Sequence, residues 1–181
     1  IKYANNSLLA TKISFINYIS RIAEQIPDGD VEEIKNAIGM DKRISESFLN
    51  AGLGFGGSCF PKDVRALIAF SKELNINSDI LQSVLTINDT QFMSVFNVLN
   101  KELGALEGKK ISILGLSFKP ETDDIRDAIS LKIIKKLLDK KAIVRVYDPI
   151  ANDSVKDVYG KSISYSSNSE SCIKGSECCI I

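Results

Sequence analysis

Residues Lys109 to Asp124 read KKISILGLSFKPETDD, and this stretch decides the fold of the second half of the chain. The run from Ile111 to Leu116 is short, apolar and bounded by polar residues, which is typical of a buried β-strand. We expect a helix over Ala128 to Asp139 and a second apolar strand over Ala142 to Tyr147. Apolar strands that alternate with helices predict a parallel, doubly wound α/β sheet of the Rossmann-like kind.

The rest of this half continues the same pattern. We expect a short helix or loop over Asn152 to Tyr159 and a strand near Ser162 to Tyr165. The last four residues, Cys178 to Ile181, look like one more strand with nothing after it. Because the first residues look like the middle of a helix, we expect the chain to be part of a longer protein whose sheet is incomplete here.

The first half has the period of helices. Apolar residues of Lys2 to Gln25 (Leu9, Ile13, Ile16, Ala23) recur on one helical face. Asp30, with Glu33 three residues later, has the pattern of a capping box and predicts a short helix that ends at Gly39. We therefore expect an all-α first domain over residues 1–105, followed by the α/β domain over residues 106–181.

Two further helices are expected in this half. One resumes near Lys62 and ends near Leu74. The other runs from Ser78 to Leu103 as a single helix and would be on the order of 38 Å long. Such a helix is long for a small domain, so we expect it to link two domains or to pack in a dimer.

The composition excludes several classes of protein and site. Lys plus Arg and Asp plus Glu are equal at 23 each, and no basic stripe suggests nucleic-acid binding. No apolar run is long enough for a membrane span. The chain has no His and its four Cys form no CxxC pair, so no metal site is expected. The adjacent Cys178 and Cys179 are interpreted as buried free thiols of a reduced, cytoplasmic protein.

The most informative segment for chemistry is Gly52 to Leu67, GLGFGGSCFPKDVRAL. Its glycines let the backbone approach a ligand closely and leave N–H groups for an anion or a sugar. Cys59 precedes a new helix, whose dipole would stabilise a thiolate, and Lys62 is close in sequence. Asp63 could order a water molecule. The alternative is a tight loop with a buried cysteine and Pro61 in the first helical turn.

Three motifs resemble those of the UDP-glucose/GDP-mannose dehydrogenase family. GFGGSCFPKD, Gly54 to Asp63, resembles the signature around the catalytic cysteine of UDP-glucose 6-dehydrogenases. KYANN, Lys2 to Asn6, followed by LLATKISFIN, resembles the K-x-x-x-N helix of the family. GLSFKP with TDDIR, within Gly115 to Arg126, resembles its GLxFKPxTDDxR loop. A weaker fourth match is DKRI, Asp41 to Ile44. Together the motifs cover nearly the whole chain.

The resemblance implies NAD-dependent oxidation of a sugar alcohol to a carboxylate in two successive hydride transfers. Cys59 would be the nucleophile, giving a thiohemiacetal and then a thioester. Lys2 would assist at the sugar hydroxyl as a base or a stabilising cation, and Asn6 would donate to the same oxygen. Asp63 would orient or activate the hydrolytic water. The alternatives are a solvated lysine, a surface amide and a first-turn helix carboxylate.

The resemblance also implies contacts with the nucleotide sugar and with NAD. Lys119 would pair with a phosphate, the ring of Phe55 would pack on the sugar or the base, and Arg43 would reach the partner's substrate across a dimer interface. For Arg43 the alternative is a surface arginine, and for Arg126 a pairing with Asp123 or Asp127. The substrate-binding set is Asn50, Ala51, Gly52, Leu53, Gly54, Phe55, Gly56, Phe118, Lys119 and Arg43. The cofactor-binding set is Cys59, Lys62 and Arg126.

The family's N-terminal NAD-binding domain is not in this sequence, because ILGLSF lacks the second and third glycines of GxGxxG. We therefore expect this chain to be inactive alone and to form a homodimer through its helical half. UDP-glucose is the expected substrate. Two alternatives stay open: a GDP-mannose 6-dehydrogenase, which shares a GGSC-x-PKD loop, and a non-catalytic module that binds a nucleotide sugar or dimerises.

Overall fold

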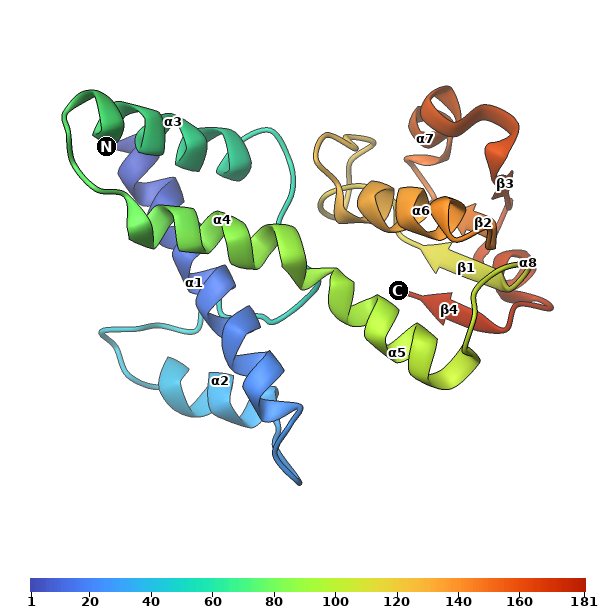
Figure 1. Cartoon of the computed structure of the whole chain (residues 1–181), viewed down its shortest axis with the longest axis horizontal. Coiled ribbons are helices and arrows are strands. Elements are labelled where there is room, and N and C mark those ends of the chain that lie inside the picture. Colours follow the sequence, from blue (N-terminus) through green and yellow to red (C-terminus); the bar gives the residue numbers. More distant parts are fainter. The chain divides into compact units, whose positions relative to one another are not determined.

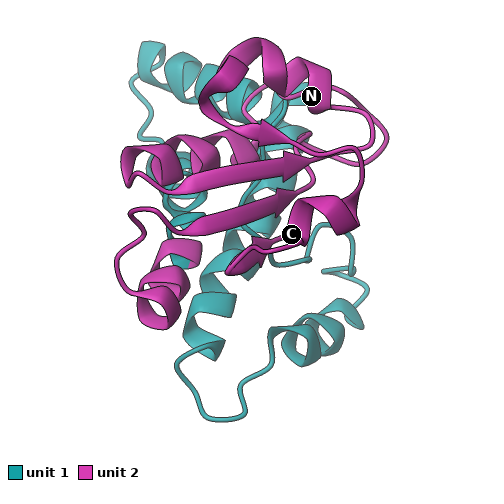
Figure 2. Ribbon diagram, turned by 90° about the vertical axis from the view of Figure 1, so that its right-hand side faces the viewer, with its two compact units in different colours: residues 1–94 teal, residues 95–181 magenta.

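The computed structural model describes all residues, Ile1–Ile181, which form two compact units (Figure 2). Unit 1 comprises Ile1–Ser94 and unit 2 comprises Val95–Ile181. The domain boundary expected from the sequence, after residue 105, lies further along the chain than this division. No helix in either unit combines the length and the apolar character needed to cross a bilayer.

Unit 1 is helical, with α1 (Lys2–Ala23), α2 (Val31–Gly39), α3 (Phe60–Glu73) and α4 (Asp79–Gln91) (Figure 1). Helix α1 packs against α3, α4 and α2, and α3 packs against α4. A small core joins these helices to the glycine-rich loop; it consists of Ala10, Phe55, Val64 and Val84. The side chain of Phe55 therefore anchors the loop that precedes α3 to the helices.

The buried face of α1 is more polar than the sequence predicted. Ser7, Ser14, Asn17 and Ser20 are buried, whereas Leu9 and Ile13 of the predicted face are only half-buried. Part of the reason is that two of these side chains bond to the backbone of other elements: the Ser14 hydroxyl donates to the Val84 carbonyl at 3.1 Å, and Asn17 Oδ1 accepts from the Gly52 N–H at 2.8 Å. Hydrogen bonds to neighbouring elements make the burial of these side chains acceptable.

Asp30 caps α2 as predicted, although its side chain bonds to Glu32 and not to Glu33, the residue that a capping box would use. The Asp30 side chain accepts a hydrogen bond from the backbone N–H of Glu32 at 2.7 Å, so the bond goes to the second helical residue. This bond satisfies one of the donors that a helix leaves free at its N-terminus.

The single helix expected from Ser78 to Leu103 is divided. Helix α4 ends at Gln91, and α5 (Met93–Leu103) begins after Phe92, whose φ of −61° and ψ of −14° correspond to a tighter turn. The Ser94 hydroxyl donates to the Gln91 carbonyl at 2.9 Å. A side chain that occupies a carbonyl of the preceding turn competes with the helical backbone bond, which explains the interruption.

Unit 2 contains a four-stranded, all-parallel sheet in the order β3-β2-β1-β4. The pairing β1–β2 sets Lys110 opposite Ile143 and Leu114 opposite Tyr147. The remaining elements of unit 2 after α5 follow in chain order: β1 (Lys110–Leu114), α6 (Ile129–Asp139), β2 (Ile143–Tyr147), α7 (Asn152–Tyr159), a 3₁₀ turn (Gly160–Ser162), β3 (Ser164–Tyr165), α8 (Ser169–Ile173) and β4 (Cys178–Ile180).

This strand order confirms the predicted doubly wound sheet. The chain passes from β1 outward to β2 and β3, then returns to pair β4 on the other side of β1, so the order reverses beside β1. Ile113, Val146 and Leu137 of α6 are among its buried residues. Helix α8 was not predicted; the Asn168 side chain caps it by accepting from the Ser171 N–H at 2.7 Å.

Candidate functional site

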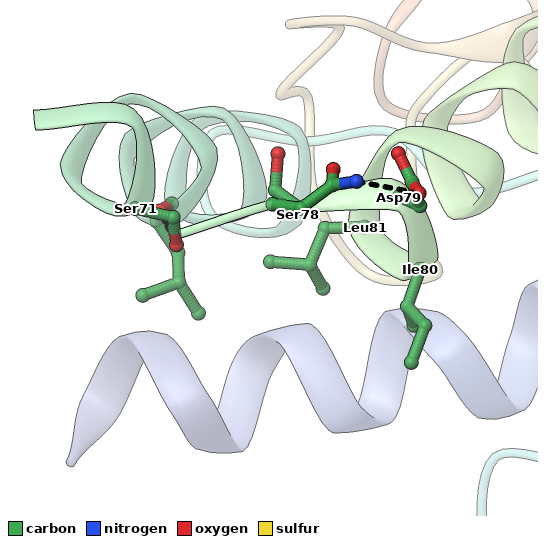
Figure 3. A pocket seen from close by; sticks show the side chains of 7 residues that line it. Ser71, Ser78, Asp79, Ile80 and Leu81 are labelled. Atoms are coloured by element: carbon green, nitrogen blue, oxygen red, sulfur yellow. Dashed lines mark hydrogen bonds between the residues drawn. The ribbon is translucent and has the colours of Figure 1, made fainter. Parts of the chain in front are cut away.

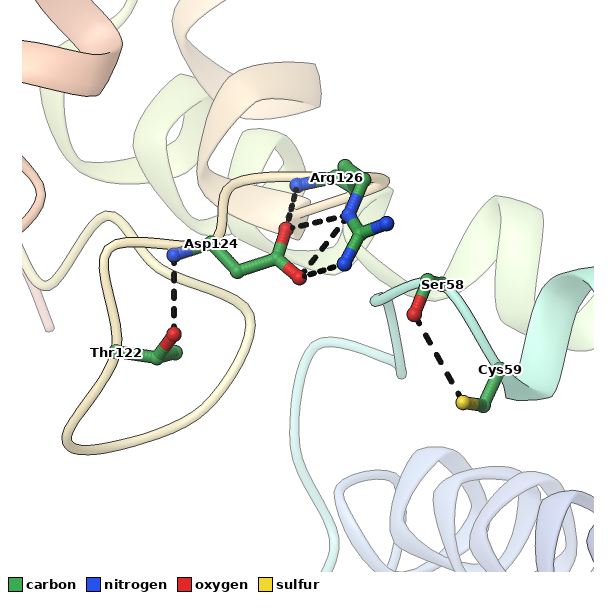
Figure 4. A network of polar contacts seen from close by, with 5 residues as sticks. All are labelled: Ser58, Cys59, Thr122, Asp124 and Arg126. Carbon is green, nitrogen blue, oxygen red and sulfur yellow. Dashed lines mark hydrogen bonds and ion pairs between the residues drawn. The ribbon is translucent and has the colours of Figure 1, made fainter.

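Cys59 lies at the N-terminal end of α3, as the last residue before the helix (Figure 4). Its side chain is exposed, and its carbonyl accepts the first-turn bond from the Asp63 N–H at 2.8 Å. The Ser58 hydroxyl lies 3.8 Å from the Cys59 Sγ. A thiol in this position lies at the N-terminal, positive end of the helix dipole.

Asp63 is the centre of the polar cluster beside this cysteine. Its side chain is fully buried, and its Oδ2 accepts a hydrogen bond from the Asn6 amide at 2.7 Å. The ammonium of Lys2 lies 3.4 Å from the same oxygen, and that of Lys62 lies 3.8 Å from Oδ1. Lys2 and Asn6 are one turn apart on α1 and share a face. The structure thus brings together four of the residues predicted from the motifs.

The surroundings of Asp63 keep it ionised. Burial alone would raise the pKa of its carboxyl, but the Asn6 hydrogen bond and the charges of Lys2 and Lys62 outweigh this and hold the pKa below its ordinary value. Oδ1 is buried and has no hydrogen-bond donor. The carboxylate therefore has one oxygen fixed by Asn6 and one acceptor available for a further donor.

The glycine-rich loop is held by three side-chain amides, which we call the amide clamp: Asn17, Asn88 and Gln91. Gly52 donates its N–H to Asn17 Oδ1 at 2.8 Å and accepts from Gln91 Nε2 at 3.0 Å. Phe55 donates its N–H to Asn88 Oδ1 at 2.7 Å and accepts from Asn88 Nδ2 at 3.0 Å. The clamp thus bonds both the N–H and the carbonyl of Gly52 and of Phe55.

Sequence reasoning missed this clamp, although a signal was present. Leu81, Val84, Asn88 and Gln91 follow the helical period, and the last three are buried. Two amides on the apolar face of a helix indicate buried hydrogen bonds, because a buried amide without partners is costly. The sequence alone does not tell which distant backbone these amides reach.

Phe55 has a different place from the one predicted. Its ring is 7% exposed and packs edge-on against Phe60, with 5.8 Å between ring centroids. The ring therefore belongs to the core of unit 1 rather than being displayed for stacking on a sugar or a base, because its neighbours Val64 and Val84 bury it. The other residues of the predicted loop set, from Asn50 to Gly56, are half-buried or exposed.

Arg43 lies on an exposed turn of unit 1. Its guanidinium contacts Asp41 through Nε and Nη2, with Nε 3.0 Å from Oδ1. These bonds hold the pKa of Asp41 below its ordinary value and raise that of Arg43. The structure thus shows a surface arginine paired with a neighbouring aspartate, and Lys12 fixes the same turn by donating to the Ile44 carbonyl at 2.9 Å.

In unit 2, the loop after β1 carries the predicted nucleotide contacts. The Lys119 ammonium lies 5.6 Å from the centre of the Phe118 ring, in cation–π range. Arg126 pairs with Asp124, with Nε 2.9 Å from Oδ1 and Nη2 2.6 Å from Oδ2 (Figure 4). The Arg126 bonds lower the pKa of Asp124 to about 2.

Asp148, which follows β2, fixes the start of this loop. It is 6% exposed; its Oδ2 accepts from the Leu116 N–H at 2.8 Å and its Oδ1 from those of Ile150 and Ala151 at 2.8 Å. Burial would raise the pKa of Asp148, but these backbone bonds outweigh it and lower the pKa. The loop therefore leaves the carboxyl end of β1 in a fixed direction, at the edge where doubly wound sheets bind ligands.

Three hollows of unit 1 contain none of the predicted site residues. One of about 300 Å³ lies at the start of α4 and includes Ser71, Ser78, Asp79, Ile80 and Leu81 (Figure 3). There the Asn77 amide donates to Asp79 at 2.8 Å. A second, of about 330 Å³, lies between α1 and α4 beside Phe15, Tyr18 and Ile80. In neither unit do three or more acidic or cysteine side chains converge as metal ligands.

Comparisons with known proteins match both units. Residues 1–90 match the central domain of the UDP-glucose/GDP-mannose dehydrogenase family, and residues 112–181 match its UDP binding domain. The UDP-glucose 6-dehydrogenases YwqF and TuaD of Bacillus subtilis (strain 168) are 46% and 40% identical over 100% of this chain, which covers 41% and 39% of theirs.

A solved UDP-glucose dehydrogenase from the hyperthermophilic archaeon Pyrobaculum islandicum superposes with a TM-score of 0.95 at 38% identity. The match covers 98% of this chain and 41% of that one. The chain thus spans about two fifths of the length of these relatives. The two domain matches, in the order in which the motifs occur, show that the chain belongs to the UDP-glucose/GDP-mannose dehydrogenase family, of which it contains the central and UDP-binding domains.

Proposed function

We propose that this chain is the central and C-terminal part of an enzyme that oxidises UDP-glucose to UDP-glucuronate with NAD. The observation that carries this proposal is the cluster of Lys2, Asn6 and Asp63 at the first turn of the helix that begins after Cys59. A nucleophile at a helix N-terminus beside a buried carboxylate and two cations is what covalent oxidation of an aldehyde requires. The identity to UDP-glucose 6-dehydrogenases supports the substrate.

Cys59 holds the sugar between the two oxidations. Its thiolate attacks the aldehyde carbon, an S–C bond forms, and the carbonyl oxygen takes a proton to give a thiohemiacetal. Loss of a hydride and of the hydroxyl proton gives the thioester. Water then attacks the acyl carbon, the S–C bond breaks, and carboxylate and thiol are released. The exposure of Cys59 at the start of α3 leaves its sulfur accessible for both steps.

Lys2, Asn6 and Asp63 manage the protons and the water. Lys2 is 64% exposed at its side chain, so its ammonium can turn toward a reacting sugar oxygen while staying near Asp63. Asn6 fixes one oxygen of Asp63, and the unpaired Oδ1 accepts a hydrogen bond from the hydrolytic water. An ionised Asp63 can orient this water and take up its proton as it attacks.

The remaining loop residues bind the nucleotide sugar. Asn50, Ala51, Gly52, Leu53, Gly54, Phe55 and Gly56 contribute contacts mostly through backbone. Lys119 supplies positive charge for a phosphate, next to the Phe118 ring. Arg43 reaches the substrate of a second subunit, which requires the guanidinium to leave Asp41. We propose a homodimer formed through unit 1, with the exposed apolar side chains of α1 as contacts.

Two NAD molecules, bound in succession, would accept one hydride each. In this chain, the residues proposed to contribute to the NAD site are Cys59, Lys62 and Arg126. The fork of Arg126 already holds a carboxylate through two parallel N–H groups, and a phosphate fits the same geometry. The other contacts come from a preceding NAD-binding domain, so this chain alone is inactive. Its four cysteines are unpaired, which supports a reducing, cytoplasmic location.

The proposal is tested by counting the NADH formed per nucleotide sugar by the full-length enzyme that contains this chain. UDP-glucose, GDP-mannose and UDP-N-acetylglucosamine are compared, with Cys59→Ser as the inactive control. Two NADH per UDP-glucose, and none with Cys59→Ser or with this chain alone, are expected. Two NADH per GDP-mannose would show that GDP-mannose is the substrate in place of UDP-glucose and would leave the proposed mechanism unchanged. Binding without NADH from any sugar would favour a non-catalytic module.

A further inference from the structure

The amide clamp leaves a defined part of the glycine-rich loop unpaired. Both backbone groups of Gly52 and of Phe55 are bonded to clamp side chains. No bond within the chain uses the backbone N–H groups that lie between and after these two residues, those of Leu53, Gly54, Gly56, Gly57 and Ser58. The loop is therefore fixed at two points, while its remaining donors are available to a ligand.

The clamp side chains are not explained by packing alone. Asn88 is 2% exposed and sits within α4, one turn after Val84, where the helical period places an apolar residue. An asparagine there is unfavourable unless its amide is used, and it pairs both groups of a single loop residue. Truncation of Asn88 would leave the Phe55 N–H and C=O without partners.

The other end of the clamp is held from α1. Gln91 is 4% exposed, and its Oε1 accepts from the Arg21 Nε at 2.7 Å, which leaves its Nε2 to donate to Gly52. Arg21 also donates to the Ile87 carbonyl at 3.3 Å and to Thr90 at 3.2 Å. The orientation of Gln91 is therefore set by a guanidinium rather than by rotamer preference alone.

We infer that the amide clamp positions the loop for the nucleotide sugar, with Asn88 and Gln91 as positioning residues whose side chains do not touch the substrate. The inference rests on the proposed function, because it takes the sugar as the partner of the free N–H groups. Cys59 follows Phe55 by four residues, so a displaced Phe55 also displaces the nucleophile. A misplacement of about 1 Å can reduce a rate on the order of a hundredfold.

The experiment compares Asn88→Ala and Gln91→Ala with Val84→Ala in the full-length enzyme. Val84 is 4% exposed on the same face of α4, so its truncation removes packing and none of the clamp's hydrogen bonds. Calorimetry gives the Kd of UDP-glucose, and initial rates give KM for the sugar and for NAD. We expect the clamp variants to raise Kd and sugar KM about tenfold, with NAD KM unchanged. Val84→Ala should stay within about twofold of wild type.

A purely structural clamp would give a different result. Sugar affinities of both clamp variants equal to wild type, or lowered equally in Val84→Ala, would overturn the inference. If Asn88→Ala does not fold, Gln91→Ala decides, since it removes one bond to the loop, that to the Gly52 carbonyl, together with the Arg21 bond that orients Gln91. Binding is measured without turnover, so the two proposals can fail separately. If the wild type forms no NADH, the proposed function is refuted. If the clamp variants still bind the sugar more weakly than the wild type, the positioning role of the clamp stands.

Discussion

The Asp63 carboxylate accepts a hydrogen bond from one amide and lies near two ammonium groups, which balance its charge. The chain has no histidine. This arrangement explains how a buried carboxylate stays ionised beside the nucleophile. Since its pKa lies below the ordinary value, Asp63 contributes stability above that value, and the contribution is lost as the pH falls through the lowered pKa. At neutral pH the residue is available to a water molecule as an acceptor.

Asp63→Asn should separate the two halves of the reaction. The amide keeps the shape of Asp63 but removes the negative charge, so hydrolysis of the thioester should slow on the order of a hundredfold. A sugar adduct on Cys59 should then accumulate during turnover and be visible in the intact mass of the full-length enzyme. Equal turnover with no adduct would contradict the role given to Asp63; Asp41→Asn is a control on an exposed turn.

The pairing of Arg126 with Asp124 predicts a carboxyl titration. The pKa of Asp124 is about 2, so its contribution to stability is present above about pH 4 and is lost as the pH falls through about 2. In Arg126→Gln the midpoint should rise toward about 3.9 and stay below it, because the backbone N–H of residue 126 still donates to the carboxylate; carbon NMR of the carboxyl measures it. In Arg43→Gln, which lies on the other unit, it should not move. A midpoint near 4 in the wild type would contradict the pairing.

At the scale of elements, the carboxyl ends of β1 and β2 are joined by Asp148. This side chain bonds the loop after β1 and the turn before α7 together, so it supports both the sheet edge and the nucleotide loop. Phe118, Lys119 and Arg126 all belong to the loop that begins at this bond. Fixing the loop at its first residue limits the directions in which these side chains can project.

Asp148→Ala should destabilise unit 2 by about 3 kcal/mol, because three backbone N–H groups, two of them buried, lose their acceptor. Asp148→Asn, which keeps one acceptor oxygen, should cost less. The pKa of Asp148 is lowered, so the difference between wild type and Asp148→Asn should shrink as the medium is acidified. Urea unfolding followed by circular dichroism measures both, and a difference that grows toward acid pH would contradict the assignment.

The elements that the sequence predicted well are those in which local pattern and packing agree. Strands β1 and β2 are mostly apolar, and the segment Asn152–Tyr159, predicted as a short helix or a loop, forms helix α7. The interruption at Phe92 could not be predicted, because it depends on the Ser94 hydroxyl reaching a backbone carbonyl. Helix α8 spans only Ser169–Ile173, too short to show a helical period.

The site was predictable only where motifs carry it. Lys2, Asn6, Cys59 and Asp63 are recognisable from sequence signatures, and the structure brings Lys2 and Asn6 to Asp63 across a separation of more than fifty residues. The burial of the Phe55 ring and the clamp of Asn88 are tertiary facts, since each depends on which backbone or core lies opposite. The buried amides of α4 indicate that each has a hydrogen-bond partner, but the sequence of this helix does not identify that partner.

At the scale of the whole molecule, each unit has its own core: Val64 and Val84 in unit 1, and Val146, Ile134 and Leu137 in unit 2. Each unit also matches its own domain of the family. The residues proposed for chemistry and most of those proposed to bind the nucleotide sugar lie in unit 1, whereas Phe118, Lys119 and Arg126 lie in unit 2. Stability and binding can therefore be altered in one unit at a time.

Leu137→Ala should destabilise unit 2 by about 2–5 kcal/mol, because it leaves a cavity beneath the sheet. Hydrogen exchange followed by mass spectrometry should show faster exchange in β1, β2 and α6, with α1 and α3 unchanged. Val64→Ala should give the reverse pattern. Acceleration spread equally over both units would contradict separate cores.

The amide clamp also bears on how such a loop can diverge between related enzymes. Since helix side chains hold the backbone at Gly52 and Phe55, the half-buried side chain of Leu53 between them is not needed to keep the path of the loop. Gly54 and Gly57, with φ of 117° and 81°, are the positions where a side chain would strain the backbone. Under the proposed function, we expect a change at Leu53 to alter the sugar preference while Cys59 keeps its position.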